Sequence, residues 1–457
     1  MEQIECRIPQ IVAAQRTYFR SHETLSIEFR LRMLQRLRDA IIKHEKSLTE
    51  ALYLDLHKSY EEAYLTEISI VLGEIKNFLK HLKKWAAPSK KKTPLKLKPA
   101  KSCIITEPLG LSLIMAPWNY PVQLLLNPLV GAIAAGCTAI LKPSPYVPNV
   151  SEALAKLINE CFEERYVTVV QGHRDVNSAL LKERYDIIFF TGSPDLGRVV
   201  MRAAAENLTP VVLELGGKSP VVVDKSANIE VAAKRIAWGK TLNAGQTCIA
   251  PDYLLIHREV KERFIEAFKR AVVELHGEDA QKSKHYVRMV SAKAFERVSG
   301  YLTDGTIRHG GRVDVADRYI EPTLLDGVRV DSAVMREEIF GPVLPIVEIE
   351  SVDQAIEFIN DREKPLALYV FAKEKHAEHV IAHTSSGGVC INDVIMHIAN
   401  EHMPFGGVGN SGMGRYHGRD SLYAFSHRRA TLNSTTRVDL PFRYMPYKWF
   451  KRIKRLL

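Results

Sequence analysis

Short apolar runs alternate with helix-length segments between residues 111 and 214. The runs span 111–116, 138–141, 166–170, 186–190 and 210–214, and the longer segments span 121–136, 151–164, 175–183 and 195–206. A strand that lacks polar alternation must be buried on both faces, so the pattern predicts a parallel sheet covered by helices on both sides. Because ligands of such sheets bind beyond the carboxyl ends of the strands, functional residues are expected at those ends.

Polar residues follow three of these runs. Trp118 and Asn119 follow the run 111–116, Lys142 follows the run 138–141, and Gly192 and Ser193 follow the run 186–190. The lysine either caps the sheet in solvent or contacts a nucleotide, and the Gly-Ser pair is either an ordinary turn or a phosphate site at a helix start. The asparagine either forms a turn or directs its amide at a developing oxyanion. The dinucleotide fingerprint GxGxxG follows none of these runs, which argues against an ordinary Rossmann site.

Cys248 ends a glycine-containing segment, Asn243-Ala-Gly-Gln-Thr-Cys, and comes 34 residues after Glu214. An unperturbed thiol is only ~3 % ionised at pH 7, so a nucleophilic cysteine needs polarising surroundings, an oxyanion site and a base. A single cysteine is more commonly a small buried hydrophobe. Glu214 lies in an apolar run, where a carboxylate is either paired with a cation or has a raised pKa suited to general-base work. A thiol, a carboxylate, an amide donor and a nucleotide cradle together indicate covalent oxidation of an aldehyde.

The charge is distributed unevenly along the 457 residues. The net charge is +10, but residues 83–101 contain eight lysines and no acid, and residues 442–457 contain six basic residues and no acid, which leaves −4 for the rest. A nucleic-acid-binding domain would carry the basic surface itself, so no nucleic-acid partner is expected. The six cysteines lack metal-ligand and disulfide spacing, so we expect no metal site and a reducing cytoplasm. Neither a signal peptide nor a membrane-spanning run is expected.

The length is sufficient for two or three domains. Residues 24–58 and 61–85 have amphipathic periodicity and are expected to be helices. The segment 95–98 alternates leucine and lysine between Pro94 and Pro99, so we expect an exposed strand that pairs with another element or subunit.

The last eleven residues, 447–457, combine an apolar and a basic face. The apolar side chains that share one helical face are Trp449, Phe450, Ile453, Leu456 and Leu457. Eleven residues cannot span a bilayer, but the pattern suits a helix that lies on an anionic membrane. The alternative is a terminal helix that docks on a neighbouring subunit or covers the substrate entrance.

Five motifs resemble those of the aldehyde dehydrogenase superfamily in their order and spacing. They are Pro117-Trp-Asn-Tyr-Pro121, Glu214-Leu-Gly-Gly-Lys218, Gly245-Gln-Thr-Cys248, Glu338-Ile-Phe-Gly-Pro342 and Pro404-Phe-Gly-Gly407. Tyr120, the segments 248–253 and 406–418, and the short N-terminus are similar to the class-three branch. That branch is associated with medium- and long-chain aliphatic and aromatic aldehydes and usually with dimers.

The resemblance implies a role for each candidate residue. Cys248 would be the nucleophile, Glu214 the base that activates the hydrolytic water, and the Asn119 side chain part of the oxyanion hole with the Cys248 N–H. Hydride transfer to NAD or NADP would give a thioester, which water then hydrolyses to the carboxylate. The residues implied to hold the cofactor are Trp118, Lys142, Gly192, Ser193, Glu338 and Phe340.

The resemblance also implies a division of the α/β chain into domains. Residues 1–85 and 103–213 would form a parallel-sheet dinucleotide-binding domain, and residues 214–400 an α/β catalytic domain. Residues 86–102 and 401–435 would form a small β extension for oligomerisation, and residues 436–457 a basic amphipathic tail.

Pro145 departs from the pattern of many relatives, which carry a carboxylate for the adenosine ribose three residues after the lysine. NADP is therefore expected to be accepted as well as NAD. Two other functions are a coenzyme-A-acylating or acyltransferase variant, which would not need Glu214, and a non-catalytic relative, which should have lost Cys248 or Glu214. Both residues are retained.

Overall fold

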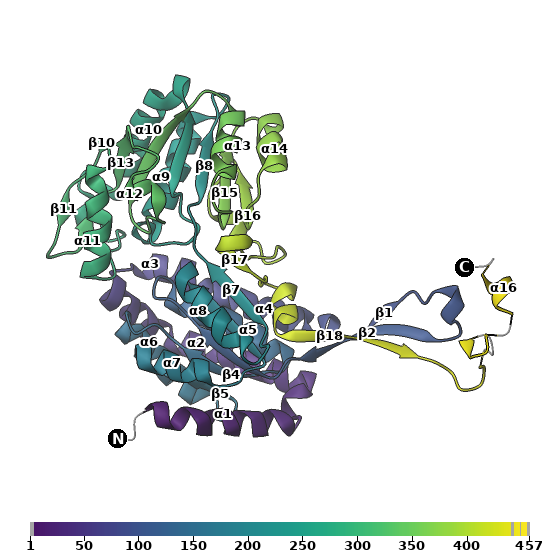
Figure 1. The fold of residues 1–457 in the computed structure, drawn as a ribbon. Coiled ribbons are helices and arrows are strands. Elements are labelled where there is room, and N and C mark those ends of the chain that lie inside the picture. Colours follow the sequence, from purple (N-terminus) through teal and green to yellow (C-terminus); the bar gives the residue numbers. More distant parts are fainter. Residues whose placement is uncertain (1–3, 440–442, 448, 455–457) are drawn as a thin grey trace.

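Two helix-covered sheets and a projecting arm make up the structure, a computed structural model that describes residues 4–439, 443–447 and 449–454 (Figure 1). The first sheet and its helices form one lobe, the second sheet forms the other, and a three-stranded arm extends away from both. The predicted α/β architecture with a small β extension is confirmed.

The first sheet has the order β17-β7-β6-β3-β4-β5, and its five longer strands are parallel. They are β3 (Leu111–Met115), β4 (Thr138–Lys142), β5 (Val167–Val169), β6 (Ile187–Gly192) and β7 (Val211–Leu215), and the short β17 (Gly412–Met413) pairs antiparallel to β7. The accompanying helices are α5 (Pro121–Ala135), α6 (Pro148–Cys161), α7 (Arg174–Lys182) and α8 (Pro194–Ala205). These elements lie where the apolar runs and helical segments predict them.

Helix α5 is buried along its whole length. Pro121 occupies its first position, where a missing N–H needs no partner. Gly136 ends it with a φ of 95°, a left-handed conformation that glycine adopts without strain. The helix begins two residues after Asn119 and therefore fixes the place of that candidate residue.

The N-terminal helices are α1 (Ile4–Arg20), α2 (Ile27–Leu56), α3 (Tyr60–Ala63) and α4 (Ser69–Trp85). Of these, α2 and α4 pack on α5, α3 packs on α2, and α1 packs on α7 and the first sheet. The helices expected over 24–58 and 61–85 are confirmed, and a π-helical turn at Tyr64–Ile68 interrupts the second.

The second sheet has the order β10-β13-β14-β9-β8-β15-β16. Its strands are β8 (Pro220–Val223), β9 (Tyr253–His257), β10 (Thr306–His309), β13 (Thr323–Asp326), β14 (Val343–Ile349), β15 (Ala367–Phe371) and β16 (Gly388–Ile391), and β11 (Val313–Asp314) pairs with β12 (Tyr319–Ile320) beside it. The helices of this lobe are α9 (Ile229–Thr241), α10 (Lys261–His276), α11 (Ala292–Gly300), α12 (Ala333–Arg336), α13 (Val352–Asn360) and α14 (Glu374–His383). The short α15 (Arg419–Ala424) leads back to the first lobe, where it packs on α5.

The arm consists of β1 (Ser89–Lys91), β2 (Lys101–Pro108) and β18 (Ser426–Asn433), all antiparallel. The prediction of a strand at 95–98 is wrong, because Leu95–Leu97 forms a 3₁₀ turn between β1 and β2. Pro94 and Pro99 lack the N–H groups that a strand ladder uses, so the alternation falls on a connection instead.

Helix α16 (Phe450–Ile453) lies near the tip of the arm (Figure 1). Helix α16 spans only Phe450–Ile453, so the prediction of a helix from 447 is wrong within the described residues. Tyr447 and Trp449 have positive φ angles of 52° and 68°, which a right-handed helix excludes. Leu456 and Leu457 lie outside the described residues.

A buried ion pair joins the N-terminal helices to the start of α5. Lys58 Nζ lies 2.6 Å from Glu67 Oε1, and both side chains are fully buried. The same ammonium donates to the Asn119 carbonyl at 3.2 Å, and Glu67 Oε2 accepts from the Val122 and Gln123 N–H groups at 2.8 and 3.4 Å. The pair thus caps α5 and holds the backbone at Asn119.

Removal of the cation alone should destabilise the first lobe. Lys58→Met would leave the Glu67 carboxylate buried without a counter-ion. We therefore expect the free energy of unfolding of this lobe to fall by about 3–5 kcal/mol, measured by urea denaturation of the whole enzyme. The Lys58→Met/Glu67→Gln variant keeps an oxygen to cap α5 and should lose less. An unfolding midpoint unchanged by Lys58→Met would contradict this role.

Candidate active site

Cys248 follows a tight turn at the end of α9. Asn243 and Ala244 have left-handed φ angles of 52° and 50°, and Gly245 follows at 71°. A Cβ on Gly245 would lie 2.3 Å from the Gly341 carbonyl oxygen, so only glycine fits there. The glycine in this motif therefore allows the cysteine loop to pack against the loop that carries Glu338.

Asn119 is hydrogen-bonded to the cysteine loop. Its Nδ2 donates to the Gln246 carbonyl at 3.0 Å, and Asn243 Nδ2 donates to the Asn119 and Gln246 carbonyls, both at 3.0 Å. Gln246 Nε2 in turn donates to the Asn243 and Arg288 carbonyls at 3.1 Å. The structure thus brings Asn119 beside Cys248, and it assigns Asn243 and Gln246 a bridging role that the sequence did not reveal.

Glu214 is a buried carboxyl group at the end of β7. Neither of its oxygens has a hydrogen-bond partner among the described residues, and burial raises the pKa of Glu214 well above its usual range. The Arg415 charge opposes that shift. Of the two interpretations open from the sequence, a cation pair and a raised pKa, the structure favours the second.

The Cys248 thiol lies in the same low-dielectric region. Burial raises its pKa, and the negative charges of Glu338 and Glu214 raise it further, while hydrogen bonds from the N–H groups of Cys248 and Ile249 lower it. The net direction is upward, so the thiol is protonated at neutral pH in this arrangement.

Glu338 points across the two glycines that follow β7. A Cβ on Gly216 would lie 2.0 Å from Glu338 Oε2, so any larger residue at this position would displace the Glu338 carboxylate. Burial, followed by the Asp252 charge, raises the pKa of Glu338 to about 8, and a hydrogen bond from the Gly217 N–H opposes this. Its Oε1 has no partner in the part of the chain that the structure describes.

A polar network holds the loop of Glu338. Lys218 is paired with Asp252, and its Nζ also donates to the Glu337 carbonyl at 2.7 Å. Asp252 Oδ2 accepts from the Ile339 N–H at 2.9 Å, and Arg297 donates to the Glu338 and Ile339 carbonyls at 3.1 and 2.9 Å. The sequence did not reveal the roles of Asp252 and Arg297, because these contacts join segments far apart in the chain.

Lys240 is a second buried cation that sequence reasoning missed. Its Nζ has no hydrogen-bond partner among the described residues, and burial lowers its pKa to about 8. The Asp252 and Glu338 charges are close enough to oppose that shift, so Lys240 lies near the Glu338 loop. In the sequence, a lysine within the otherwise apolar end of α9 could have indicated this buried cation.

Three further candidates lie at the carboxyl ends of β4 and β6. Lys142 is buried, its Nζ donates to the Pro143 carbonyl at 2.7 Å, and burial lowers its pKa to about 8. Gly192 ends β6, and the Ser193 side chain caps α8 by accepting from the Leu196 N–H.

The last two candidates, Trp118 and Phe340, meet each other edge to face with their ring centroids 5.4 Å apart. This contact joins the end of β3 to the loop of Glu338. The described residues contain no group of three or more His, Cys, Asp or Glu side chains placed to hold a metal ion.

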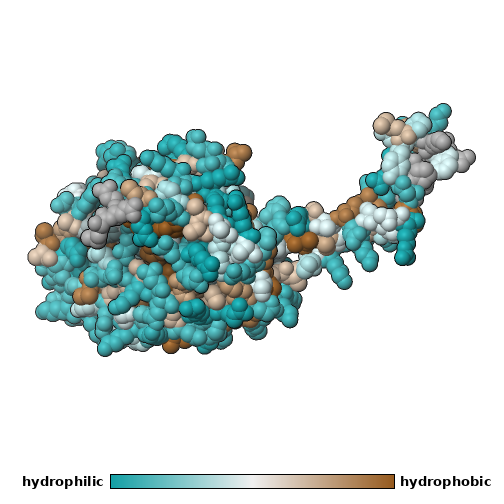
Figure 2. Space-filling view, turned by 90° about the horizontal axis from the view of Figure 1, so that it is seen from below, coloured by the Kyte–Doolittle hydropathy of each residue, from teal (hydrophilic) through white to brown (hydrophobic). Residues whose placement is uncertain are grey.

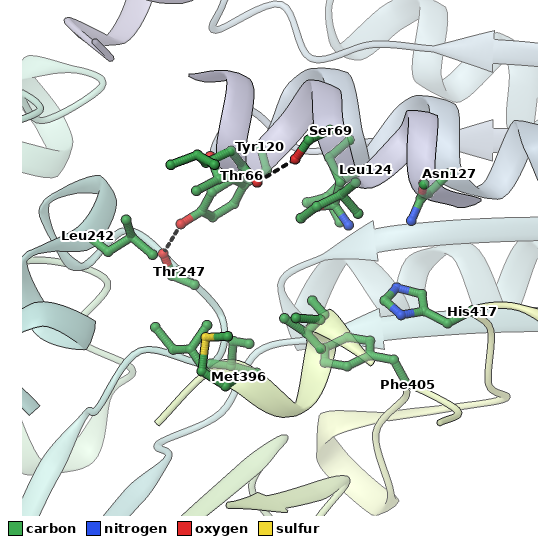
Figure 3. Close-up of a pocket in the computed structure, with 18 of the residues that line it drawn as sticks. Thr66, Ser69, Tyr120, Leu124, Asn127, Leu242, Thr247, Met396, Phe405 and His417 are labelled. Carbon is green, nitrogen blue, oxygen red and sulfur yellow. Dashed lines mark hydrogen bonds between the residues drawn. The ribbon is translucent and has the colours of Figure 1, made fainter. Parts of the chain in front are cut away.

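A cavity of about 480 Å³ opens beside Cys248 (Figure 3). Tyr120 closes one side, and its hydroxyl lies 2.7 Å from Thr247 Oγ1. Most of the wall is apolar and includes Leu65, Ile70, Leu124, Trp238, Ile395 and Phe405. The arrangement can hold an extended apolar molecule with one end at the thiol.

Comparison of the sequence with known proteins identifies relatives that oxidise aldehydes, in agreement with a thiol and a carboxyl group beside an apolar cavity. Residues 5–431 match the Aldehyde dehydrogenase family. The chain is 49% identical over 443 residues to the 4,4'-diaponeurosporen-aldehyde dehydrogenase of Staphylococcus aureus, covering 96% of each chain. It is 47% identical to the dimeric NADP-preferring aldehyde dehydrogenase of Canis lupus familiaris, covering 93% of this chain and 94% of the relative.

Among solved structures, the substrate-bound state of Staphylococcus aureus AldH matches with a TM-score of 0.97 at 48% identity, and the match covers the whole of both chains. The resemblance read from the five motifs is therefore confirmed. The chain belongs to the aldehyde dehydrogenase family, and it is an NAD(P)-dependent aldehyde dehydrogenase.

Proposed function

We propose that this enzyme oxidises medium- and long-chain aliphatic or aromatic aldehydes to carboxylic acids at Cys248. The observation that carries this proposal is the position of the Cys248 thiol in the wall of a largely apolar cavity, close to the buried Glu214 and Asn119. An apolar chain or ring would leave water for this cavity, and the aldehyde group would lie at the thiol.

In the proposed mechanism the Cys248 thiol first loses its proton to water, and the thiolate then attacks the carbonyl carbon to form the anion of a thiohemiacetal. The second N–H of the Asn119 amide and the Cys248 N–H stabilise the oxyanion. NAD(P), when held by the residues described below, would supply the hydride acceptor that the conversion of the thiohemiacetal to a Cys248 thioester requires. Glu214 then takes a proton from the water that hydrolyses the thioester, and its raised pKa makes it a stronger base for that step. A buried base of this kind also favours hydrolysis over transfer of the acyl group to coenzyme A.

The described residues fit a dinucleotide cofactor. The N-terminus of α8, preceded by Gly192 and Ser193, offers N–H groups and a positive dipole end for phosphate. Lys142 supplies a cation, and the unpartnered Oε1 of Glu338 supplies an acceptor for a ribose hydroxyl. The rings of Trp118 and Phe340 would complete the site beside the adenosine and the nicotinamide, respectively.

The role of the thiol is tested by substitution. Cys248→Ala removes the only atom that forms the covalent bond, so aldehyde-dependent NAD(P) reduction should fall to background while NAD binding, measured by calorimetry, is retained. Cys6→Ala changes an exposed cysteine and should leave activity intact. Turnover in Cys248→Ala near that of the unmodified enzyme would refute the mechanism.

We infer that NADP is accepted beside NAD because Pro145 brings no negative charge to the position three residues after Lys142. A carboxylate there would bind the ribose hydroxyls of NAD and repel a 2′-phosphate. The name of the canine relative, NADP-preferring, supports this inference.

Pro145→Glu should therefore shift the cofactor preference, measured as the ratio of kcat/KM for NAD to that for NADP, towards NAD by about tenfold or more. Pro145→Gln, which adds a similar side chain without the charge, should shift the ratio less. Strict NAD dependence of the unmodified enzyme would contradict the inference.

We also propose a cytoplasmic homodimer assembled through the arm. The arm extends well away from both lobes, and apolar residues are visible along it in Figure 2. A partner subunit would cover these residues, and the name of the canine relative includes the word dimeric. In this proposal residues 86–102 and 401–435 serve assembly, residues 1–85 and 103–213 bind cofactor, and residues 214–400 carry the catalytic lobe.

We propose, finally, that the tail at 436–457 makes peripheral contact with anionic membranes. Trp449 and Phe450 are each 61% exposed. A hollow at the arm tip is lined by Lys96, Lys98 and Arg443, so residues from both basic segments meet there. None of the helices in the described ranges is long and apolar enough to cross a membrane, and this contact requires none.

Sedimentation with vesicles that contain phosphatidylserine tests the membrane contact. Each basic residue near such a surface contributes ~1 kcal/mol, so the intact enzyme should bind in a salt-sensitive manner and a chain that ends at Pro441 should not. Lys451→Gln/Lys454→Gln should bind more weakly than the intact enzyme. Equal binding by the intact and shortened chains would rule the contact out.

A further inference from the structure

Tyr369 is a buried tyrosine whose hydroxyl group reaches the loop of Cys248 from the second sheet. It belongs to the interior strand β15, where its backbone pairs with Val221 of β8 on one side and with Cys390 of β16 on the other. Its side chain is fully buried. The hydroxyl donates a hydrogen bond to the carbonyl of Ile249, the residue directly after Cys248. A strand that is paired on both sides therefore anchors the backbone beside the thiol.

Cys248 and Ile249 are the two central residues of a tight turn. The Ala250 N–H donates to the Thr247 carbonyl at 2.9 Å and closes this turn. The N–H groups of Cys248 and Ile249 donate hydrogen bonds to the thiol sulfur, and these bonds oppose the upward shift of its pKa. The direction in which these two N–H groups point depends on how the turn is held.

The same hydroxyl supports a strained turn in the wall of the cavity. The Ile395 N–H donates a hydrogen bond to Tyr369 Oη. Ile395 has a φ of 64° and a ψ of −40°, and the Met396 N–H donates to the Val394 carbonyl at 2.6 Å. These angles and this bond define a γ-turn of the rare, strained kind. A β-branched residue seldom adopts a positive φ, and such a conformation persists only where its surroundings hold it.

The strained turn lies at the thiol end of the cavity. Ile395 and Cys248 both line the cavity. In Figure 3 their neighbours in the chain, Met396 and Thr247, lie at the same end of it. The Tyr369 hydroxyl thus joins the segment that carries the thiol to the wall against which a substrate would pack next to its reacting carbon.

We propose that Tyr369 is a positioning residue for the nucleophile, because one hydroxyl ties the residue after Cys248 to the strained turn of the cavity wall. This inference rests on the proposed function, in which Cys248 attacks the aldehyde. The hydrogen bonds of Asn119 hold the loop before Cys248, and Tyr369 holds it after Cys248. Without the hydroxyl, the Ile249 carbonyl would lose its hydrogen bond in a dry environment. The turn would then shift, and its N–H groups would no longer point at the sulfur.

Alkylation of the thiol tests this role. Tyr369→Phe removes the hydroxyl and keeps the ring. Iodoacetamide is added at one fixed pH without cofactor, and modification of Cys248 and of the exposed Cys6 is followed by peptide mass spectrometry. The ratio of the Cys248 rate to the Cys6 rate should fall by about threefold to tenfold, because the N–H groups stabilise the thiolate less well. The kcat/KM for aldehyde oxidation should fall by about tenfold or more, whereas the Kd of NAD, measured by calorimetry, should stay the same.

Tyr286→Phe is the matched control. Tyr286 is also fully buried, and its hydroxyl donates to the Ile320 carbonyl at 2.8 Å. This variant loses the same kind of hydrogen bond, so its thermal unfolding midpoint should fall by a similar amount while its alkylation ratio and kcat/KM stay unchanged. If the two variants lost stability alike and neither changed the alkylation ratio, the Tyr369 hydroxyl would be purely structural and the inference would be overturned.

The alkylation ratio separates this inference from the proposed function. An unchanged ratio in Tyr369→Phe, together with an inactive Cys248→Ala, would overturn the positioning role and leave the proposed function standing. Aldehyde oxidation by Cys248→Ala would overturn the proposed function. Because alkylation needs no aldehyde and no cofactor, the comparison of Tyr369→Phe with Tyr286→Phe would still decide whether Tyr369 orients the thiol.

Discussion

The hydrogen bonds between Asn119, Asn243 and Gln246 are the constraint on which the site depends. Asn119 lies between strand β3 of the first sheet and helix α5. Asn243 and Gln246 belong to the loop that leads to Cys248 in the second lobe. These hydrogen bonds hold the two lobes in the relative position that places the Asn119 amide beside the Cys248 thiol. The buried Lys58–Glu67 pair extends the same junction, since its ammonium reaches the Asn119 carbonyl.

Burial then gives the site its chemistry. Glu214, Glu338 and Cys248 lie close enough that each carboxylate raises the pKa of the thiol, and burial is the largest cause of all three raised pKa values. A dry site of this kind keeps the Cys248 thiol protonated at neutral pH, and it makes Glu214 a stronger base. The same low dielectric strengthens the hydrogen bonds that an oxyanion would receive from Asn119.

Much of the first lobe was predictable from sequence, because its strands are buried on both faces and so contain no polar alternation. The alternation of leucine and lysine misled at 95–98, where two prolines exclude a strand, and the helical periodicity of the tail misled at Tyr447 and Trp449, whose φ angles are positive. The role of Arg297 was not predictable, since it arises from hydrogen bonds between segments far apart in the chain.

In the proposed mechanism the acyl group passes through Cys248, and the water that Glu214 activates removes it. The most direct test mixes the Glu214→Gln variant with aldehyde and NAD, quenches the reaction in acid within the first turnover, and locates the acyl group by peptide mass spectrometry. We expect a burst of reduced cofactor and an acyl adduct that accumulates on the peptide that contains Cys248. Full steady-state turnover without such an adduct, or an adduct on a different cysteine, would contradict it.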